Sequence, residues 1–167
     1  MPRLDFHECL KRFYSRMYPD VDMGTVSFHE GLPFYATGNP HAITVGRRIY
    51  FADGKFDPCS AKGVALIAHE LFHIKQGAGG PGVWFVRPFY VRYFIQKVLS
   101  GWTKGRRHPL EIPAYEQQDR VEAAYAAASG STGESGPCQC SDGHPGEFHQ
   151  AFSNAFYEAL AKSSGQQ

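Results

Sequence analysis

Two histidines and a glutamate within an apolar segment form the pattern in this sequence that is best suited to chemistry. His69, Glu70 and His73 follow the apolar run 64–68. Residues four apart on an α-helix are separated by about 6 Å along the axis and project from one face, which suits two imidazole ligands of a single zinc ion. A carboxylate beside the first ligand can activate a zinc-bound water without binding the metal. We therefore predict one zinc ion per chain, bound by His69 and His73, with Glu70 as the catalytic base of a zinc metallopeptidase.

The same three residues would also fit an ordinary helix in which Glu70 forms a surface ion pair. The neighbouring residues argue against this interpretation, because Leu, Ile, Ala and Phe make up most of the segment. Burying three ionisable groups there without partners would cost several kcal/mol. Zinc coordination removes that cost, and it is the interpretation that we adopt.

A third protein ligand is expected later in the chain, and Glu111 is the favoured candidate. Zinc sites with two histidines on one helix often take a glutamate from a following helix. Glu111 with Ala114 resembles the Glu-x-x-Ala pattern of gluzincins, the zinc peptidases with a glutamate as third ligand. Members of that group often carry an aspartate four residues after the ligand, where this chain has Tyr115. Glu116 is a rival ligand, and Glu122 is a more distant one.

Other residues are candidates for supporting roles. Gln76 could form a hydrogen bond near the zinc site or simply end the helix. Cys138 and Cys140 with His144 faintly resemble a second metal site, although their spacing is not a standard zinc pattern. Three residues are candidates for stabilising the negative charge of the transition state: Tyr93, His108 and Tyr115.

The composition predicts a single folded domain over residues 1–167. Apolar residues make up 43% of the chain, and a net charge of +1 argues against nucleic acid or an anionic membrane as an obligatory partner. The expected partner is a peptide or protein substrate. The most apolar long stretch, Val83 to Leu99, contains Arg87, Arg92 and Lys97 and is too charged to cross a bilayer. Because the N-terminus lacks a signal-peptide core, we expect a cytoplasmic protein, or one exported without a classical signal peptide.

The four cysteines do not resemble a disulfide framework. Two of them, Cys138 and Cys140, are separated by a single residue, and the other two are Cys9 and Cys59. We therefore expect a reducing compartment.

Periodicity and turn residues predict an α+β fold, with a small N-terminal sheet packed on a mainly helical body around a central zinc-binding helix. Gly46 separates two short apolar runs that read as a hairpin. Ser60 is a suitable N-cap for the central helix, and Pro145 suits the first turn of the last one. The predicted strands are 25–29, 42–45 and 48–51, and the predicted helices are 5–18, 60–76, 83–100, 110–129 and 144–163, with an irregular loop over 130–143.

These segments together resemble a known bacterial family, the metallopeptidase-like core domain associated with extracellular contractile injection systems. The resemblance covers roughly residues 20–77 and includes the Ala-Ile-Thr-x-Gly hairpin and the terminal glutamine of the zinc helix. It implies a zincin-like fold, zinc ligation by His69 and His73, catalysis by Glu70, and secretion-system components as partners. The segments that carry it are Val21–His29, Ala42–Gly46, Ile49–Phe51 and Gly63–Gln76.

Three alternatives for the function follow. The first is a metallopeptidase, for which a strand of the hairpin 42–51 would be an exposed edge that pairs with an extended peptide. The second is a catalytically silent, zinc-stabilised binding or assembly module of a secretion or toxin-delivery system. The third is an autoinhibited peptidase, in which the loop 130–143 places a thiolate of Cys138 or Cys140 on the zinc.

Overall fold

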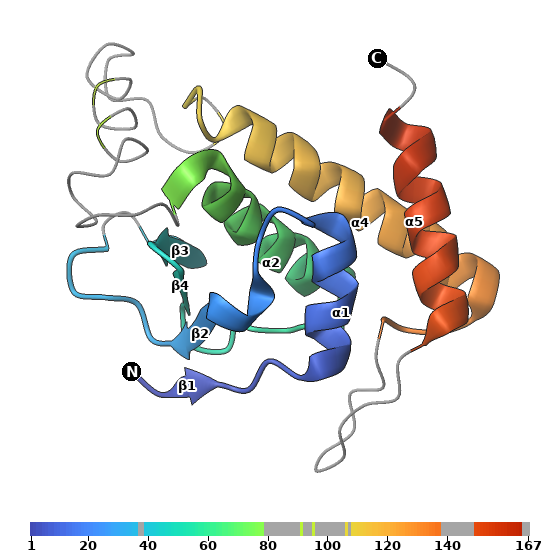
Figure 1. Cartoon of the computed structure of the whole chain (residues 1–167), viewed down its shortest axis with the longest axis horizontal. Helices are drawn as coiled ribbons and strands as arrows, with labels where there is room; N and C mark the ends of the chain where they lie inside the picture. The colour runs from blue at the N-terminus through green and yellow to red at the C-terminus, as the bar shows by residue number, and fades with distance from the viewer. Residues whose placement is uncertain are drawn as a thin grey trace.

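The protein has an α+β fold, with a small sheet on one side of a group of helices (Figure 1). The computed structural model describes residues 1–36, 39–78, 91, 95, 106, 108–137 and 149–164. Within these residues four strands form one sheet. The four helices of this part of the chain are α1 (Glu8–Met17), α2 (Ala61–His73), α4 (Ile112–Thr132) and α5 (Gln150–Ser164).

The sheet has the strand order β1-β2-β4-β3 and mixes parallel and antiparallel pairs. β3 (Ala42–Val45) and β4 (Arg48–Phe51) form an antiparallel hairpin with the predicted bounds, and Gly46 adopts a φ of 67° in its turn. β2 (Ser27–Glu30) runs parallel to β4. It begins two residues later than predicted, because Met23–Thr25 form a 3₁₀ turn. β1 (Arg3–Leu4), which was not predicted, pairs antiparallel with β2.

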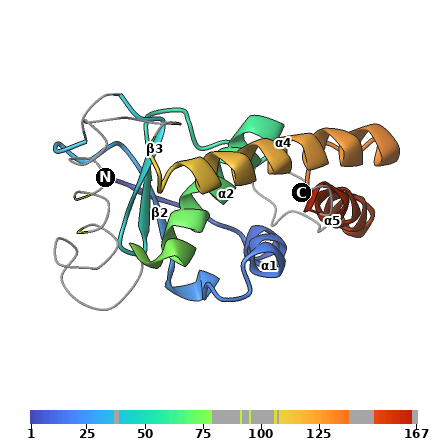
Figure 2. The same cartoon turned by 90° about the horizontal axis from the view of Figure 1, so that it is seen from above.

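Helix α2 occupies the centre of the fold, as its apolar sequence predicts. Its residues Val64, Ile67 and Leu71 are completely buried. Figure 2 shows α2 beside the sheet, with α1 and α4 along its other sides and α5 against α4. Because the sheet covers one side of α2 and helices cover others, the polar residues at its C-terminal end are enclosed by several elements.

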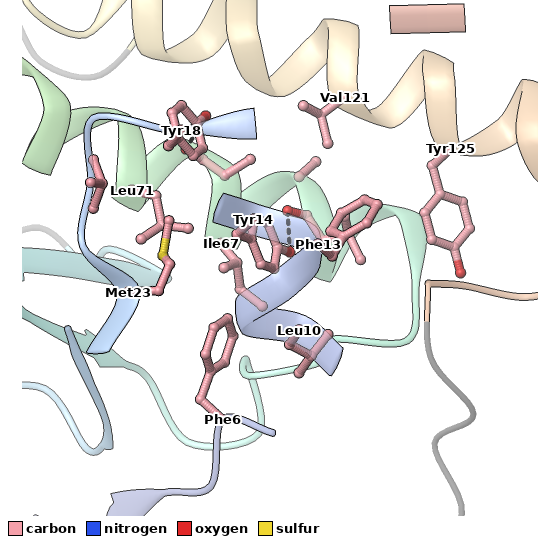
Figure 3. Close-up of a cluster of buried hydrophobic side chains, with 14 of the residues drawn as sticks. Phe6, Leu10, Phe13, Tyr14, Tyr18, Met23, Ile67, Leu71, Val121 and Tyr125 are labelled. Atoms are coloured by element: carbon pink, nitrogen blue, oxygen red, sulfur yellow. Dashed lines mark hydrogen bonds between the residues drawn. The ribbon is translucent and has the colours of Figure 1, made fainter. Parts of the chain in front are cut away.

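Two tyrosines, Tyr14 of α1 and Tyr18 directly after this helix, fix the position of α2. The hydroxyl of Tyr14 donates a hydrogen bond of 3.1 Å to the carbonyl of Val64, and that of Tyr18 donates one of 2.8 Å to the carbonyl of Ala68. Figure 3 shows both tyrosines within the apolar cluster between the two helices. Buried hydroxyls need such partners, so these bonds specify how far α2 is shifted along α1.

The start of α2 depends on Gly63. The N–H of Gly63 donates to the Ser60 side chain at 3.1 Å, so Ser60 is the N-cap that the sequence predicts. The carbonyl of Asp57 lies against the same glycine, and a Cβ on Gly63 would be 1.6 Å from that oxygen. The connection from β4 to α2 can therefore pass this close only because residue 63 lacks a side chain.

Replacing Gly63 with alanine is expected to lower the free energy of unfolding by about 3 kcal/mol, because backbone must move to relieve the clash. Gly130 is the matched control, since it also lies in a helix but has open space around its Cα. Gly130→Ala is expected to raise the free energy of unfolding by about 0.5–1 kcal/mol. Urea titrations of both variants measure the difference, and equal effects would contradict the close approach at Gly63.

Several helix boundaries differ from the predictions. α1 begins at Glu8 rather than at residue 5, and α4 continues to Thr132, past the predicted end at residue 129, before Gly133 caps it with a φ of 74°. α2 ends at His73, and Ile74–Ala78 form a π-type turn in place of the last predicted helical turn. α5 begins at Gln150 instead of residue 144. The predicted helix 83–100, apart from the helical Val91 and Ile95, and residues 138–148 lie outside the described part of the chain.

The prediction that the cysteines do not form disulfides is wrong for the two that the structure describes. Cys9 and Cys59 are both disulfide-bonded. Disulfides are typical of oxidising compartments, so the expectation of a reducing compartment loses its basis. Spacing was misleading because it reports only the sequence separation of cysteines and not which of them meet in the folded chain. The proposed second metal site and the autoinhibitory contact involve Cys138 and Cys140, which lie outside the described residues.

The stretch that the sequence offered as the nearest candidate for a membrane span, Val83 to Leu99, lies outside the described residues except for Val91 and Ile95. None of the helices in the described ranges combines the length and the apolar character that a membrane span requires.

Candidate metal centre

Three side chains converge at the C-terminal end of α2. The Nε2 atoms of His69 and His73 are 3.1 Å apart, and the Oε2 of Glu111 lies 3.2 Å from the first and 3.3 Å from the second. His69 and His73 come from one face of α2, while Glu111 is the residue that precedes α4. The predicted third ligand therefore joins the two predicted histidines in one cluster of potential metal ligands.

The separation of these three atoms fits a tetrahedral zinc site. Ligand atoms about 2.0–2.1 Å from zinc at tetrahedral angles lie about 3.3–3.4 Å from one another, close to the distances found here. Two imidazole nitrogens and one carboxylate oxygen are also a usual donor set for catalytic zinc. The two histidines are 5% and 6% exposed, so water has little access to hydrogen-bond their ring nitrogens. A cation among the three atoms would satisfy all of them.

The rival ligands do not reach this cluster. Glu116 lies on the exposed side of α4, and Glu122 lies further along the same helix. Neither belongs to the cluster that contains Glu111. Within the described ranges, Glu111 alone of these three carboxylates contacts the histidines.

The pKa values of His73 and Glu111 shift as expected for a hydrogen-bonded pair. Burial by itself lowers the pKa of His73, but the hydrogen bond with Glu111 and the negative charge of Glu70 outweigh it, so the pKa lies above the ordinary value. Burial raises the pKa of Glu111, but hydrogen bonds with His69 and His73 outweigh it and hold the pKa well below the ordinary range. Glu111 is therefore an anion at neutral pH, as a zinc ligand must be.

Glu70 is held beside the cluster by Thr44, a residue that sequence analysis did not select. The Thr44 hydroxyl is 2.6 Å from the Oε2 atom of Glu70 and 3.1 Å from its backbone carbonyl. Thr44 lies on β3 and is buried, so the sheet contacts α2 at the predicted base. The signal available in the sequence was the polar Thr44 among apolar residues of the hairpin, but its partner could not be read from it.

Of the two candidate transition-state stabilisers that the structure describes, Tyr115 contacts one of the histidines. Its ring packs edge-on against His69, with 4.6 Å between ring centroids, and the guanidinium carbon of Arg106 lies 4.7 Å from the centroid of the Tyr115 ring. His108 is fully buried, and its Nδ1 accepts a hydrogen bond from the N–H of Leu110. A buried ring offers no surface to a substrate, which makes Tyr115 the better placed of the two. The third candidate, Tyr93, lies outside the described residues.

The two histidines differ in how their outer nitrogens are held. The Nδ1 of His73 is 2.8 Å from the Oε1 of Gln76. The buried Nδ1 of His69 has no hydrogen-bond partner in the described part of the chain. Gluzincins often have an aspartate at the position of Tyr115, where this chain offers an aromatic ring instead. The ring orientation of His69 therefore depends on packing, whereas that of His73 depends on a hydrogen bond.

Comparison with known proteins connects the N-terminal part of the chain to one family. Residues 8–81 match the family model of the eCIS core domain, and this range includes His69, Glu70 and His73 but ends before Glu111. Searches of curated proteins and of solved structures found no significant match. Residues 8–81, which make up less than half of the chain, are therefore similar to the eCIS core domain.

Proposed function

We propose that this protein is a zinc-dependent metallopeptidase with a zincin-like fold. The observation that carries the proposal is the convergence of His69, His73 and Glu111. Glu70 follows His69 in α2, and its negative charge helps to raise the pKa of His73. Catalytic zinc sites use three protein ligands and keep one position open, whereas structural sites are closed by four. Within the described residues the cluster has three members, which favours an open site.

Each residue of the site has a separate role in the proposed hydrolysis. Zinc bound by the three ligands would polarise the scissile carbonyl and lower the pKa of a bound water to about 7. Glu70 accepts a proton from the attacking water and passes it to the leaving amine. Thr44 keeps the Glu70 carboxylate oriented through the bond to Oε2. Tyr115, beside His69, is the residue that we assign to stabilising the negative charge of the transition state.

We further propose that an extended peptide substrate pairs with β3. This strand ends the sheet on the side where Thr44 contacts Glu70. Backbone hydrogen bonds to an edge strand would place the peptide antiparallel or parallel to β3 and near the ligands. The length of peptide required for cleavage tests this idea, because pairing with a strand requires several residues on each side of the scissile bond.

Replacing Thr44 with valine is expected to lower kcat about 10-fold, because the Glu70 carboxylate loses the hydroxyl that orients it. Thr44→Ser is the matched control, since it keeps the hydroxyl and should retain most of the activity. Zinc content and the melting temperature of each variant show whether the metal site and the fold are intact. Equal kcat in the valine and serine variants would contradict the role of Thr44.

The proposed function is tested first by elemental analysis of the purified protein and the His69→Ala variant. We expect one zinc per chain in the wild type and almost none in the variant. Digestion of a peptide library by the zinc-loaded protein then tests hydrolysis. Absence of zinc from the wild type, or zinc without any cleavage, would count against the peptidase.

The match of residues 8–81 favours a second candidate function, a zinc-stabilised binding or assembly module of a contractile injection system. In that case the metal serves the fold and not a reaction. Chelation distinguishes the two, because a structural zinc is required for folding whereas a catalytic one is not. Loss of the cooperative melting transition after chelation would favour the assembly module.

A further inference from the structure

The side-chain amide of Gln76 lies between two parts of the metal centre that are distant in sequence. Its Oε1 is 2.8 Å from the Nδ1 of His73, and its Nε2 donates a 3.0 Å hydrogen bond to the carbonyl of Leu110. Leu110 immediately precedes Glu111. One amide therefore contacts the second histidine ligand and the segment that carries the glutamate ligand.

The bond to Leu110 determines which tautomer His73 adopts. A backbone carbonyl only accepts hydrogen bonds, so the NH₂ group of Gln76 must face Leu110 and its oxygen must face His73. That oxygen also only accepts, so the hydrogen lies on Nδ1 of His73. In the neutral ring Nε2 then carries the lone pair, and Nε2 is the atom that faces His69 and Glu111.

Gln76 also completes the fixation of the turn before Glu111. The N–H of Leu110 donates to the Nδ1 of the buried His108, and its carbonyl accepts from Gln76. The turn is closed by a 2.8 Å bond from the N–H of Glu111 to the carbonyl of His108. With both backbone groups of Leu110 bonded, the direction in which Glu111 leaves the turn is set before any metal binds.

The backbone of the π-type turn allows this placement. The N–H of Ile74 still bonds to the carbonyl of Glu70, four residues earlier, and also to that of Leu71, and the π-type turn Ile74–Ala78 begins at this residue. Gly77 then leaves the helix with a φ of 108°, a conformation that favours glycine. Local π-type turns are rare and are frequent at functional sites.

We propose that Gln76 is a positioning residue that fixes the tautomer of His73 and the turn of Glu111, and so raises the affinity of the site for zinc. The inference rests on the zinc site of the proposed function but not on hydrolysis. Partners of this kind, which orient a ligand without touching the metal, usually change metal affinity by about 10–100-fold.

The first test is the zinc Kd of the full chain, measured by competition with a chromophoric chelator. Gln76→Ala is expected to weaken zinc binding about 10–100-fold. Gln150→Ala is the matched control, because Gln150 is exposed on α5 and bonds only to Asn154 among the contacts described for it. Its Kd should equal that of the wild type.

The second test is nitrogen-15 NMR of the histidine side chains in the metal-free protein. At about pH 9 the wild type should show a protonated Nδ1 on His73, because the Oε1 of Gln76 accepts that hydrogen. Gln76→Glu keeps an acceptor for that proton and should retain the signal, whereas Gln76→Ala should lose it. The same spectra show whether each variant is folded.

The outcomes separate this inference from the proposed function. If the wild type binds zinc and Gln76→Ala binds it within about threefold as tightly, the positioning role is refuted and the peptidase is unaffected. If Gln76→Ala weakens zinc binding and the zinc-loaded wild type cleaves no peptide, the peptidase is refuted and the positioning role stands. A wild type that binds no zinc refutes both.

Discussion

The Glu70→Gln variant is expected to bind zinc as the wild type does and to lose about 10²–10⁴-fold in kcat. Glutamine has the shape of glutamate, and its amide oxygen can still accept the hydrogen bond from Thr44. The geometry of the site is therefore kept, while the group that takes a proton from water is removed. Single-turnover peptide cleavage and the zinc content of the same preparation measure the two properties together.

Glu116→Gln provides the control for Glu70→Gln, because Glu116 carries the same group at an exposed position of α4. Its kcat should remain within about twofold of the wild type, as is usual for surface substitutions. Wild-type turnover in Glu70→Gln would refute the assigned base. A large loss in both variants would point to a general effect of charge and not to a role of Glu70.

The Glu111→Gln variant is expected to lose at least about 100-fold in zinc affinity, more than the removal of an outer partner usually costs. The carboxylate oxygen of Glu111 lies within 3.3 Å of both histidine nitrogens, and an uncharged amide oxygen is a much weaker zinc ligand. The turn that carries residue 111 should remain in place, because its hydrogen bonds use backbone atoms of this residue. Isothermal titration with zinc measures the change.

Two further variants complete the test of the third ligand. Glu116→Gln and Glu122→Gln remove the carboxylates that the sequence left as rivals, and both should bind zinc like the wild type. A loss of affinity in Glu122→Gln with none in Glu111→Gln would show that the ligand set changes when metal binds. The cluster assigned to Glu111 would then be wrong.

The Glu70→Gln and Glu111→Gln variants together discriminate between the candidate functions. A peptidase requires both Glu70 and Glu111, one for proton transfer and one for the metal. A zinc-stabilised assembly module requires Glu111 but not Glu70, because only the metal contributes to its stability. Binding of an injection-system component that survives Glu70→Gln but fails in Glu111→Gln would favour the module.

The sequence by itself determined the features that depend on neighbouring residues. The spacing of His69 and His73 placed both on one face of a helix, and Gly46 between two short apolar runs predicted the hairpin with the correct bounds. The resemblance of Glu111 and Ala114 to a gluzincin helix indicated the third ligand, which the structure brings to the histidines. The hairpin bounds and the shared helix face were predictable because helical periodicity and turn chemistry act over a few residues.

Tertiary structure alone decided which distant segments meet. Thr44 orients Glu70 because β3 packs against α2, and Gln76 reaches Leu110 because α4 begins beside the π-type turn. The disulfide bonds of Cys9 and Cys59 likewise contradicted the prediction that was drawn from the spacing of the cysteines. No local pattern encodes such contacts, since they depend on how far and at what angle whole elements pack. The candidate metal ligands could thus be proposed from local sequence, while the orientation of their side chains is a property of the assembled core.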